Sequence, residues 1–347
     1  MRDEQRMVSI IIPCRNEQPY IAKALDSVLN QDYVGDLEII VADGMSDDGT
    51  RVILDEYAAK YPQIHWVDNP EGVVPYALNR CIAKSKGDII IRLDAHSIYP
   101  QDYISELTKY LSSLNADNVG GVWITKPANN SAEAIAIALA TSHPLGVGNS
   151  EFRLENDTIK EVDTVPYGCY KREVFDKIGL FDTDLVRNQD DELNARLKKH
   201  GGKIFMIPSV KISYFARPNF KKMRKMFYHY GLYKPLVNVK IGAPTTIRQF
   251  IPPAFTLAQL LWLILALLGN FVWATVAFVL IWAPYLGIIS LVSAKISGKE
   301  KTPGLFMKLV QTFPQIHLSY GWGYLLGFFK VLAFLTGRKM KPVEISR

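Results

Sequence analysis

The residues best suited to chemistry stand together at positions 88–97, where the sequence reads Asp-Ile-Ile-Ile-Arg-Leu-Asp-Ala-His-Ser. Asp94 and His96 end a β-branched run and are two positions apart, so both side chains can point at one cation. Carboxylate oxygen suits Mg²⁺ or Mn²⁺, and imidazole is tolerated by Mn²⁺. Such a cation would hold a diphosphate. The structural alternative is that Asp94 caps the following turn and His96 is a surface residue.

A second acidic group stands at Asp190, Asp191 and Glu192, where a helix is predicted to begin. Acidic residues in a first helical turn are favoured by the helix dipole, which explains them without any function. The alternative is that one of them faces the cleft as a general base. A carboxylate near a bound diphosphate can take a proton from a hydroxyl nucleophile.

Buried strands must position these groups. Apolar runs at Val8–Cys14, Glu38–Asp43, Ile64–Val67 and before Asp94 alternate with helical patterns. This alternation predicts an α/β fold, a mostly parallel sheet with helices on both faces, whose ligands bind at the carboxyl ends of the strands. Neither a Gly-x-Gly-x-x-Gly nor a Gly-x-x-x-x-Gly-Lys sequence follows the first strand, which argues against the usual dinucleotide fold and against a P-loop enzyme.

The net charge of +6 is divided unevenly along the chain. Residues 1–192 hold 32 acidic residues against 18 Lys and Arg, a balance of −14. Residues 193–347 hold 22 Lys and Arg against two acidic residues, a balance of +20. Such asymmetry indicates an anionic surface near the C-terminal half, either nucleic acid or lipid headgroups.

An uncharged run of 46 residues, 249–294, favours the membrane and argues against nucleic acid. Gly269 and Asn270 divide it into segments 249–268 and 271–294, each near the ~20 residues that a bilayer requires. We expect a helical hairpin with its turn on the far side and, by the positive-inside rule, both flanks in the cytoplasm. A third apolar segment, about 309–336, is interrupted by Pro314 and His317, so it is either a third span or an interfacial segment.

The predicted organisation therefore has three parts. Residues 1–215 form the cytosolic α/β domain, 216–248 an interface region, and 249–347 a membrane region that ends in a basic tail. Within the interface region, Arg217–Tyr233 combines basic residues with apolar ones at helical spacing, which is typical of a helix in the membrane interface. The polar start, Met1–Arg6, predicts no signal peptide. Three cysteines without metal-type spacing predict reduced cytosolic thiols.

Four motifs together resemble the inverting, nucleotide-sugar-dependent glycosyltransferases of family 2, which have the GT-A fold. They are Val8–Glu17, Val41–Thr50, Asp94-Ala-His96 at the Asp-x-Asp position, and Gln189-Asp-Asp-Glu-Leu-x-x-Arg196. The resemblance covers roughly residues 7–215. With the membrane region, the chain is most similar to the bacterial exopolysaccharide branch related to the succinoglycan glucosyltransferases. The Gln-x-x-Arg-Trp motif of processive synthases does not occur, so one sugar per encounter is expected.

The resemblance implies a UDP-sugar donor and assigns residues to it by position. Asp43 would bond the uracil ring, with Pro13 and Glu17 beside it. Asp94 would meet the ribose as well as the metal. Arg172 matches a recurrent basic position and is grouped with the donor-binding residues.

The resemblance also implies the metal site and the base. Asp94 and His96 would hold Mg²⁺ or Mn²⁺, with His96 in place of the family's second metal carboxylate. Asp190 aligns with the catalytic base and is preferred to Asp191. Gln189 stands where the family has Glu, and the loss of this like charge is expected to lower the base's pKa slightly.

The function implied is sugar transfer from a UDP-sugar to a polyprenyl-diphosphate-linked saccharide, in exopolysaccharide or cell-surface glycan synthesis. The enzyme would be a multi-pass protein of the bacterial inner membrane with a cytoplasmic catalytic domain. Membrane lipid is an expected partner, other exopolysaccharide assembly proteins are candidate partners, and nucleic acid is not expected. Two alternatives are transfer directly onto polyprenyl phosphate and a non-catalytic membrane sensor of nucleotide sugars.

Overall fold

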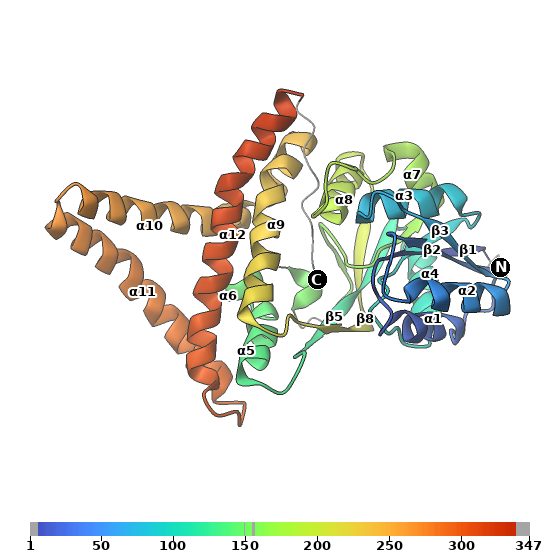
Figure 1. Cartoon of the computed structure of the whole chain (residues 1–347), viewed down its shortest axis with the longest axis horizontal. Coiled ribbons are helices and arrows are strands. Elements are labelled where there is room, and N and C mark those ends of the chain that lie inside the picture. The colour runs from blue at the N-terminus through green and yellow to red at the C-terminus, as the bar shows by residue number, and fades with distance from the viewer. Residues whose placement is uncertain (1–5, 149, 155–156, 338–347) are drawn as a thin grey trace. The chain divides into compact units, whose positions relative to one another are not determined.

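The computed structural model describes residues 6–148, 150–154 and 157–337 (Figure 1). The chain forms two compact units: unit 1 comprises residues 1–124 and 154–214, and unit 2 comprises 125–153 and 215–347. One boundary between the units falls at 214–215, and the sequence places the end of the α/β domain at 215. Segment 125–153, which we expected inside the N-terminal domain, instead belongs to unit 2. The predicted basic tail at 338–347 lies outside the described residues.

Segment 125–153 joins unit 2 because its helix is apolar. This helix, α5 (Ala132–Thr141), is rich in Ala and Ile, and most of its residues are buried. Ala136, Ile137 and Ala140 pack in one hydrophobic cluster with Phe313 and Ile316 of unit 2. A helix so apolar must bury its surface against other helices or lipid.

The centre of unit 1 is an eight-stranded sheet in the order β3-β2-β1-β4-β7-β5-β8-β6. Strands β1 to β4 are parallel, and β7 pairs with β4 and β5 in the antiparallel sense. The mostly parallel sheet that the sequence predicted is therefore confirmed. The strands are β1 (Val8–Cys14), β2 (Leu37–Asp43), β3 (Ile64–Asp68), β4 (Ile89–Arg92), β5 (Asn118–Lys126), β6 (Lys160–Glu161), β7 (Cys169–Lys171) and β8 (Ile204–Phe215).

Helices cover both faces of this sheet. Ile10 and Ile12 point to the face where α1 (Ile21–Leu29), α2 (Thr50–Lys60) and α4 (Tyr103–Ser113) contribute to one core. Helix α3 (Val74–Lys84) packs against β1 and β2 outside that core, and the Cys81 thiol donates to the Ile40 carbonyl. Because side chains alternate along a strand, a run such as Val8–Cys14 with every residue buried requires cover on both faces.

The parallel register brings the carboxyl ends of the strands to one edge. Cys14 at the end of β1 lies beside Asp43 at the end of β2, and Ile11 lies beside Arg92 at the end of β4. The Leu93 amide then donates to the Ile11 carbonyl, so the chain continues along β1 as far as Asp94. This edge carries the predicted site.

Unit 2 is helical. It contains α5, α6 (Pro144–Val147), α9 (Phe220–Ile241), α10 (Ile251–Leu267), α11 (Phe271–Ser297) and α12 (Leu305–Leu335). Residues 247–267, 271–297 and 305–335 form three helices long and apolar enough to cross a membrane. They overlap the apolar segments predicted at 249–268, 271–294 and about 309–336. Helix α9 continues past the predicted interface segment, through Pro235, and packs along α12.

Candidate active site

An arginine that is absent from the predicted site residues joins the two predicted acidic groups. Arg92, at the end of β4, places its Nη2 atom 2.8 Å from Asp94 Oδ1 and its Nη1 atom 3.2 Å from Asp190 Oδ2. Its guanidinium lies over the Tyr167 ring, 5.4 Å from the centroid. The Arg92 side chain is 9% exposed, against 17% for Asp94 and 29% for Asp190, so both ion pairs are partly shielded from water. Residues 94 and 190 thus share one cation.

The two carboxyl groups have pKa values shifted in opposite directions. Burial raises the pKa of Asp94, but attraction to the Arg92 guanidinium and smaller favourable contacts outweigh burial and hold that pKa below its ordinary value. For Asp190, burial raises the pKa, Arg92 opposes this, and repulsion from Asp94 and Asp191 leaves the pKa above its ordinary value. Neighbouring carboxyl groups with pKa values pushed apart are typical of acid–base sites.

The donors near Asp94 fit a metal ion that is carried by a diphosphate. His96 is partly exposed, and its Nδ1 atom lies 3.9 Å from Glu17 Oε1. Among the described residues, no three His, Cys, Asp or Glu side chains are arranged to hold a metal ion by themselves. Mg²⁺ is commonly held by one or two protein ligands together with substrate phosphates. Asp94 and His96 match that limited donor set.

The predicted nucleoside-binding residues lie at the same edge of the sheet. Pro13 pairs with Ala42 in the β1–β2 register, and Glu17, 2% exposed, follows in the loop after β1. Asp43 is fully buried. Its Oδ1 atom accepts from the Ser46 hydroxyl at 2.5 Å, and its Oδ2 atom pairs with Arg51 at 2.7 Å. A base that bonded Asp43 would therefore share or replace the Ser46 contact.

Arg172 is not brought into this cluster. It begins α7 (Arg172–Ile178), and its backbone amide donates to the Asp88 carbonyl. Its side chain donates to the Gly87 carbonyl at 2.5 Å and to the Ser85 hydroxyl at 2.9 Å. These contacts are at the beginning of β4, whereas Asp94 follows the end of the same strand. Its contacts tie α7 to the segment that leads into β4.

Helix α8 (Gln189–Lys199) is anchored so that Asp190 reaches Arg92. One turn beyond Asp190, the Asn194 Oδ1 atom accepts from Asn118 Nδ2 at 2.9 Å and from the Tyr170 hydroxyl at 3.2 Å. Its Nδ2 atom donates to Thr164 at 2.8 Å. This buried amide network ties α8 to β5 and β7.

A signal for Arg92 was present in the sequence. An arginine inside a run as apolar as Ile89–Leu93 is buried, and a buried arginine almost always has an anionic partner. This reasoning predicts that a carboxylate lies beside Arg92, but it does not identify which acidic residue supplies it. Tyr167 carried no comparable signal, because aromatic residues are common in any core.

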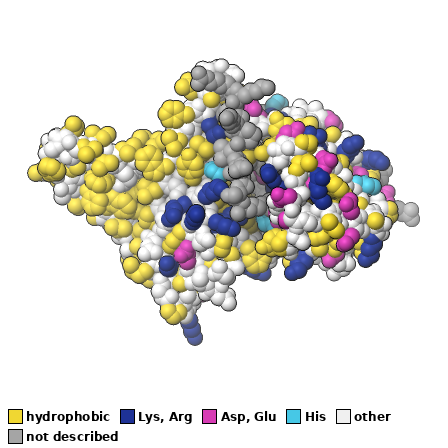
Figure 2. All heavy atoms as spheres, in the orientation of Figure 1, with side chains coloured by type: hydrophobic (Ala, Val, Ile, Leu, Met, Phe, Trp, Pro, Cys, Tyr) yellow, Lys and Arg dark blue, Asp and Glu magenta, His cyan; other side chains and the backbone are white. Residues whose placement is uncertain are grey.

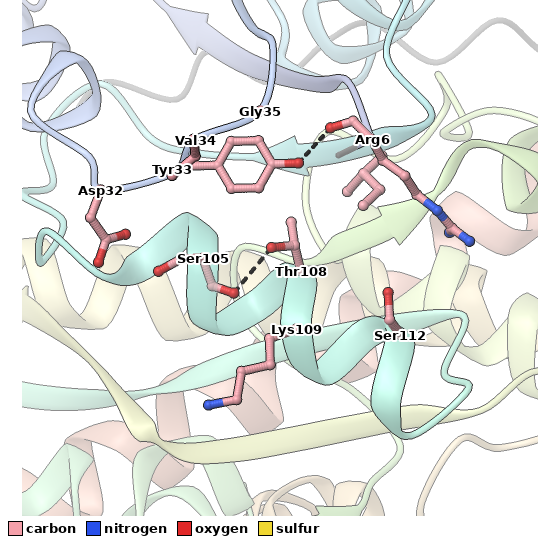
Figure 3. Close-up of a pocket in the computed structure, with 10 residues that line it drawn as sticks. Arg6, Asp32, Tyr33, Val34, Gly35, Ser105, Thr108, Lys109 and Ser112 are labelled. Atoms are coloured by element: carbon pink, nitrogen blue, oxygen red, sulfur yellow. Dashed lines mark hydrogen bonds between the residues drawn. The ribbon is translucent and has the colours of Figure 1, made fainter. Parts of the chain in front are cut away.

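A second hollow in unit 1 does not belong to the site. It has a volume of about 240 Å³, and β4 contributes only Ile89 to its lining (Figure 3). Two of its polar side chains already bond other lining residues: Tyr33 donates to the Arg6 carbonyl, and Thr108 donates to the Ser105 carbonyl at 3.0 Å. None of the predicted site residues lines it.

The fold is that of the GT-A glycosyltransferases. A mannosyltransferase from Pyrobaculum calidifontis, solved with GDP-Man and Mn²⁺, has a TM-score of 0.53 at 18% identity, over 97% of this chain and 77% of that one. Residues 1–349 of Staphylococcus aureus TarS, solved with UDP, have a TM-score of 0.51 at 14% identity, over 98% and 94% of the two chains.

Sequence similarity identifies the family within this fold. A profile for "Glycosyl transferase family 2" matches residues 9–179. The succinoglycan biosynthesis protein ExoA of Rhizobium meliloti is 30% identical over 247 residues, 71% of this chain and 74% of ExoA. A dolichyl N-acetyl-α-D-glucosaminyl phosphate 3-β-D-2,3-diacetamido-2,3-dideoxy-β-D-glucuronosyltransferase of Methanococcus voltae is 33% identical over 239 residues, 66% and 73% of the two chains. The chain belongs to glycosyltransferase family 2.

Proposed function

We propose that this glycosyltransferase moves a sugar from a UDP-sugar to a membrane-lipid-linked saccharide, with inversion at the anomeric carbon. One observation carries the proposal: Arg92 holds Asp94 and Asp190 together at the carboxyl edge of a parallel sheet. Asp94 is then available for the donor's metal and phosphates, and Asp190 is available for the acceptor hydroxyl. Family membership supports the same division of roles.

Asp190 is the proposed general base. Its Oδ1 atom is buried and has no hydrogen-bond partner among the described residues, so it can accept a proton from a hydroxyl group. The raised pKa makes Asp190 a stronger base than an ordinary aspartate. The acceptor oxygen attacks the anomeric carbon from the face opposite UDP, the bond to the UDP oxygen breaks, and the hydroxyl proton passes to Asp190. Asp191 is the alternative base.

Asp94 and His96 are the proposed ligands of Mg²⁺ or Mn²⁺, with Pro13, Glu17 and Asp43 as the nucleoside-binding residues. A divalent ion, when bound, neutralises the diphosphate and stabilises the charge on the leaving group. Arg92 keeps Asp94 ionised and therefore able to serve as a ligand, because it lowers that residue's pKa. Arg172 is omitted from the proposed site, since its contacts are at the other end of β4.

The proposed acceptor is a polyprenyl-diphosphate-linked saccharide at the bacterial inner membrane. The Methanococcus voltae relative is named for transfer to a dolichyl-linked sugar phosphate, and the Rhizobium relative for succinoglycan biosynthesis. Three apolar helices suit an enzyme that meets a lipid acceptor at the bilayer. We place the enzyme as a multi-pass protein with a cytoplasmic catalytic unit. Polyprenyl phosphate itself is a second candidate acceptor.

The test is UDP release by the purified, detergent-solubilised chain across a panel of UDP-sugars. Each donor is offered with Mn²⁺, Mg²⁺ or EDTA, and with a lipid-linked saccharide extract, polyprenyl phosphate or no lipid. We expect release with one donor that needs both metal and the saccharide extract. Asp94→Ala and Asp190→Asn should each lose at least about 100-fold of that rate, the lower range for a general base.

Asp176→Asn is the matched control, because Asp176 is an exposed aspartate on α7 of the same unit. It should keep the wild-type rate. Full activity of Asp190→Asn together with loss in Asp191→Asn would move the base to Asp191. Release with polyprenyl phosphate alone would favour the second acceptor. UDP binding without turnover under every condition would contradict the enzyme proposal and favour a nucleotide-sugar sensor.

A further inference from the structure

Helix α12 packs along α9 for most of the length of α9. Near the start of the pair Lys308 lies over the Phe220 ring at 5.4 Å, and near its end Lys240 lies over the Phe334 ring at 4.5 Å. Between these points the backbones meet at glycines: a Cβ atom on Gly323 would lie 2.1 Å from the Tyr228 carbonyl oxygen. The two helices therefore form one α9–α12 pair with a single orientation relative to a membrane.

Helix α9 is unsuited to the bilayer core. Its basic residues are spread along its whole length: Lys221, Lys222, Arg224, Lys225, Lys234 and Lys240. The first and last are about 29 Å apart at the α-helical rise. Each Lys or Arg at the bilayer centre costs roughly 2.5–3.5 kcal/mol or more, whereas near an anionic surface each gains about 1 kcal/mol. These charges favour a pair lying flat at the lipid headgroups.

Of the hairpin formed by α10 and α11, helix α10 meets α12 near the middle of α12, whereas α11 packs along the first half of α12, where Ile289 and Ile296 lie in one cluster with Leu309. A Cβ atom on Gly321 would lie 2.0 Å from the Thr256 hydroxyl of α10, and the Tyr285 hydroxyl of α11 lies 2.7 Å from His317 Nδ1. Both arms then extend away from α12 and meet at their turn (Figure 1). If α12 crossed the bilayer, α10 would start at the midplane, about 15 Å from either face of the hydrocarbon. Helices α10 and α12 therefore cannot both cross.

The charge and burial of these helices indicate which of them enters the bilayer. No charged residue occurs in 249–294, and the most apolar windows of the two hairpin helices are only 11% and 6% buried. The corresponding window of α12 is 28% buried, and α12 contains Lys308, His317 and Lys330. Figure 2 shows hydrophobic side chains covering the projecting hairpin, with Lys and Arg at its base. The hairpin is the better membrane segment.

We propose that α12 lies in the membrane interface beside α9, on an anionic lipid surface, and that only the α10–α11 hairpin enters the bilayer core. Both ends of α12 are then on the same face of the membrane. The inference does not depend on the donor or acceptor of the transferase, and it decides between the two interpretations of segment 309–336.

The test uses cysteines introduced on either side of α12, labelled by a charged, membrane-impermeant maleimide. Lys301→Cys precedes α12 and Thr336→Cys follows it, and both positions are exposed. The three native cysteines are buried, so the parent chain is the unlabelled control. We expect both variants to react in sealed inverted membrane vesicles and both to be protected in spheroplasts. Asn270→Cys at the hairpin turn should not react in the inverted vesicles.

Labelling of Lys301→Cys and Thr336→Cys from opposite faces would overturn the proposal. Protection of Thr336→Cys on both faces, with labelling only after detergent, would also overturn it, because that end of α12 would then lie in the hydrocarbon. Lys299→Cys and Gly337→Cys repeat the comparison at neighbouring exposed positions if a first variant fails to accumulate. UDP release by each variant reports separately on the transferase unit.

Discussion

Replacing Arg92 with methionine should damage stability and catalysis together. Methionine fills a similar volume but leaves Asp94 and Asp190 as two carboxylates without their shared cation. The Arg92 contacts, at 2.8 Å and 3.2 Å, are partly shielded from water. Each is worth about 5–6 kcal/mol of gross attraction at an effective dielectric constant near 20.

The net loss is smaller than the gross attraction, because the variant no longer buries a guanidinium. Removing one partner of a buried ion pair typically costs about 3–5 kcal/mol. For a unit of this size that corresponds to a fall in the melting temperature of roughly 6–20 °C. Arg80→Met is the control, since Arg80 pairs with Glu71 at the surface, where an ion pair contributes about 0–1 kcal/mol.

The stability lost on replacing Arg92 should increase with pH. Arg92 lowers the pKa of both Asp94 and Asp190, so its removal raises both values in the folded state. These carboxyl groups then have higher pKa values in the folded variant than in the unfolded chain. At pH values between the two, the folded variant binds more protons, so its free energy of unfolding falls as pH rises. The deficit relative to wild type should therefore be smaller at pH 5 than at pH 8. The acidic limb of the rate profile should move to higher pH.

Two assays measure these effects. Thermal unfolding of the detergent-solubilised chain at pH 5 and pH 8 measures the stability deficit, and UDP release from pH 5 to 9 measures the rate profile. Arg92→Lys should recover part of the stability, because its ammonium keeps the charge but cannot form both contacts in the same fork geometry. A melting temperature within 2 °C of Arg80→Met at both pH values would refute the reasoning. An unshifted rate profile would refute the coupling of Arg92 to the base.

Three further predictions concern other parts of the structure. Gly323→Ala should lower the free energy of unfolding by roughly 1–3 kcal/mol, because its Cβ would clash with the Tyr228 carbonyl. Gly287→Ala is the control: no atom lies within 4 Å of its Cβ position, so thermal unfolding should show a neutral or slightly stabilising effect. Arg172→Ala should lower the melting temperature yet leave UDP affinity, measured by calorimetry, within about twofold; a tenfold loss would return Arg172 to the site. Burial raises the pKa of Cys81 to about 12, so this thiol should not react with a disulfide reagent at pH 8 until the chain is unfolded.

The sheet and its site edge could be predicted because their signals are local. A run such as Val8–Cys14 is buried on both faces, and the residue that ends it must lie at the carboxyl edge. The positions of Asp43 and Asp94 follow from that rule alone. The uncharged run 249–294 likewise predicts two apolar helices, because a charge in hydrocarbon is costly over the whole length of a span.

Long-range partners could not be predicted in the same way. Arg92 pairs with Asp190, and nothing near either residue in sequence encodes that pairing. Segment 125–153 leaves unit 1 because its apolar helix finds partners more than 170 residues later, around Phe313. The orientation of α12 depends on the glycines that bring it against α9, and hydropathy carries no information about such packing.

The acidic triplet that begins α8 shows how far local geometry can narrow a functional choice. Successive residues of an α-helix are turned by about 100°, so three adjacent acids point in three directions. Glu192 pairs with Arg196, four residues on, at 2.8 Å, and this helical spacing alone favours a structural ion pair for Glu192. Asp190, turned by about 200° from Glu192, faces Arg92 instead. The choice between Asp190 and Asp191 needs the position of Arg92, which only the folded chain supplies.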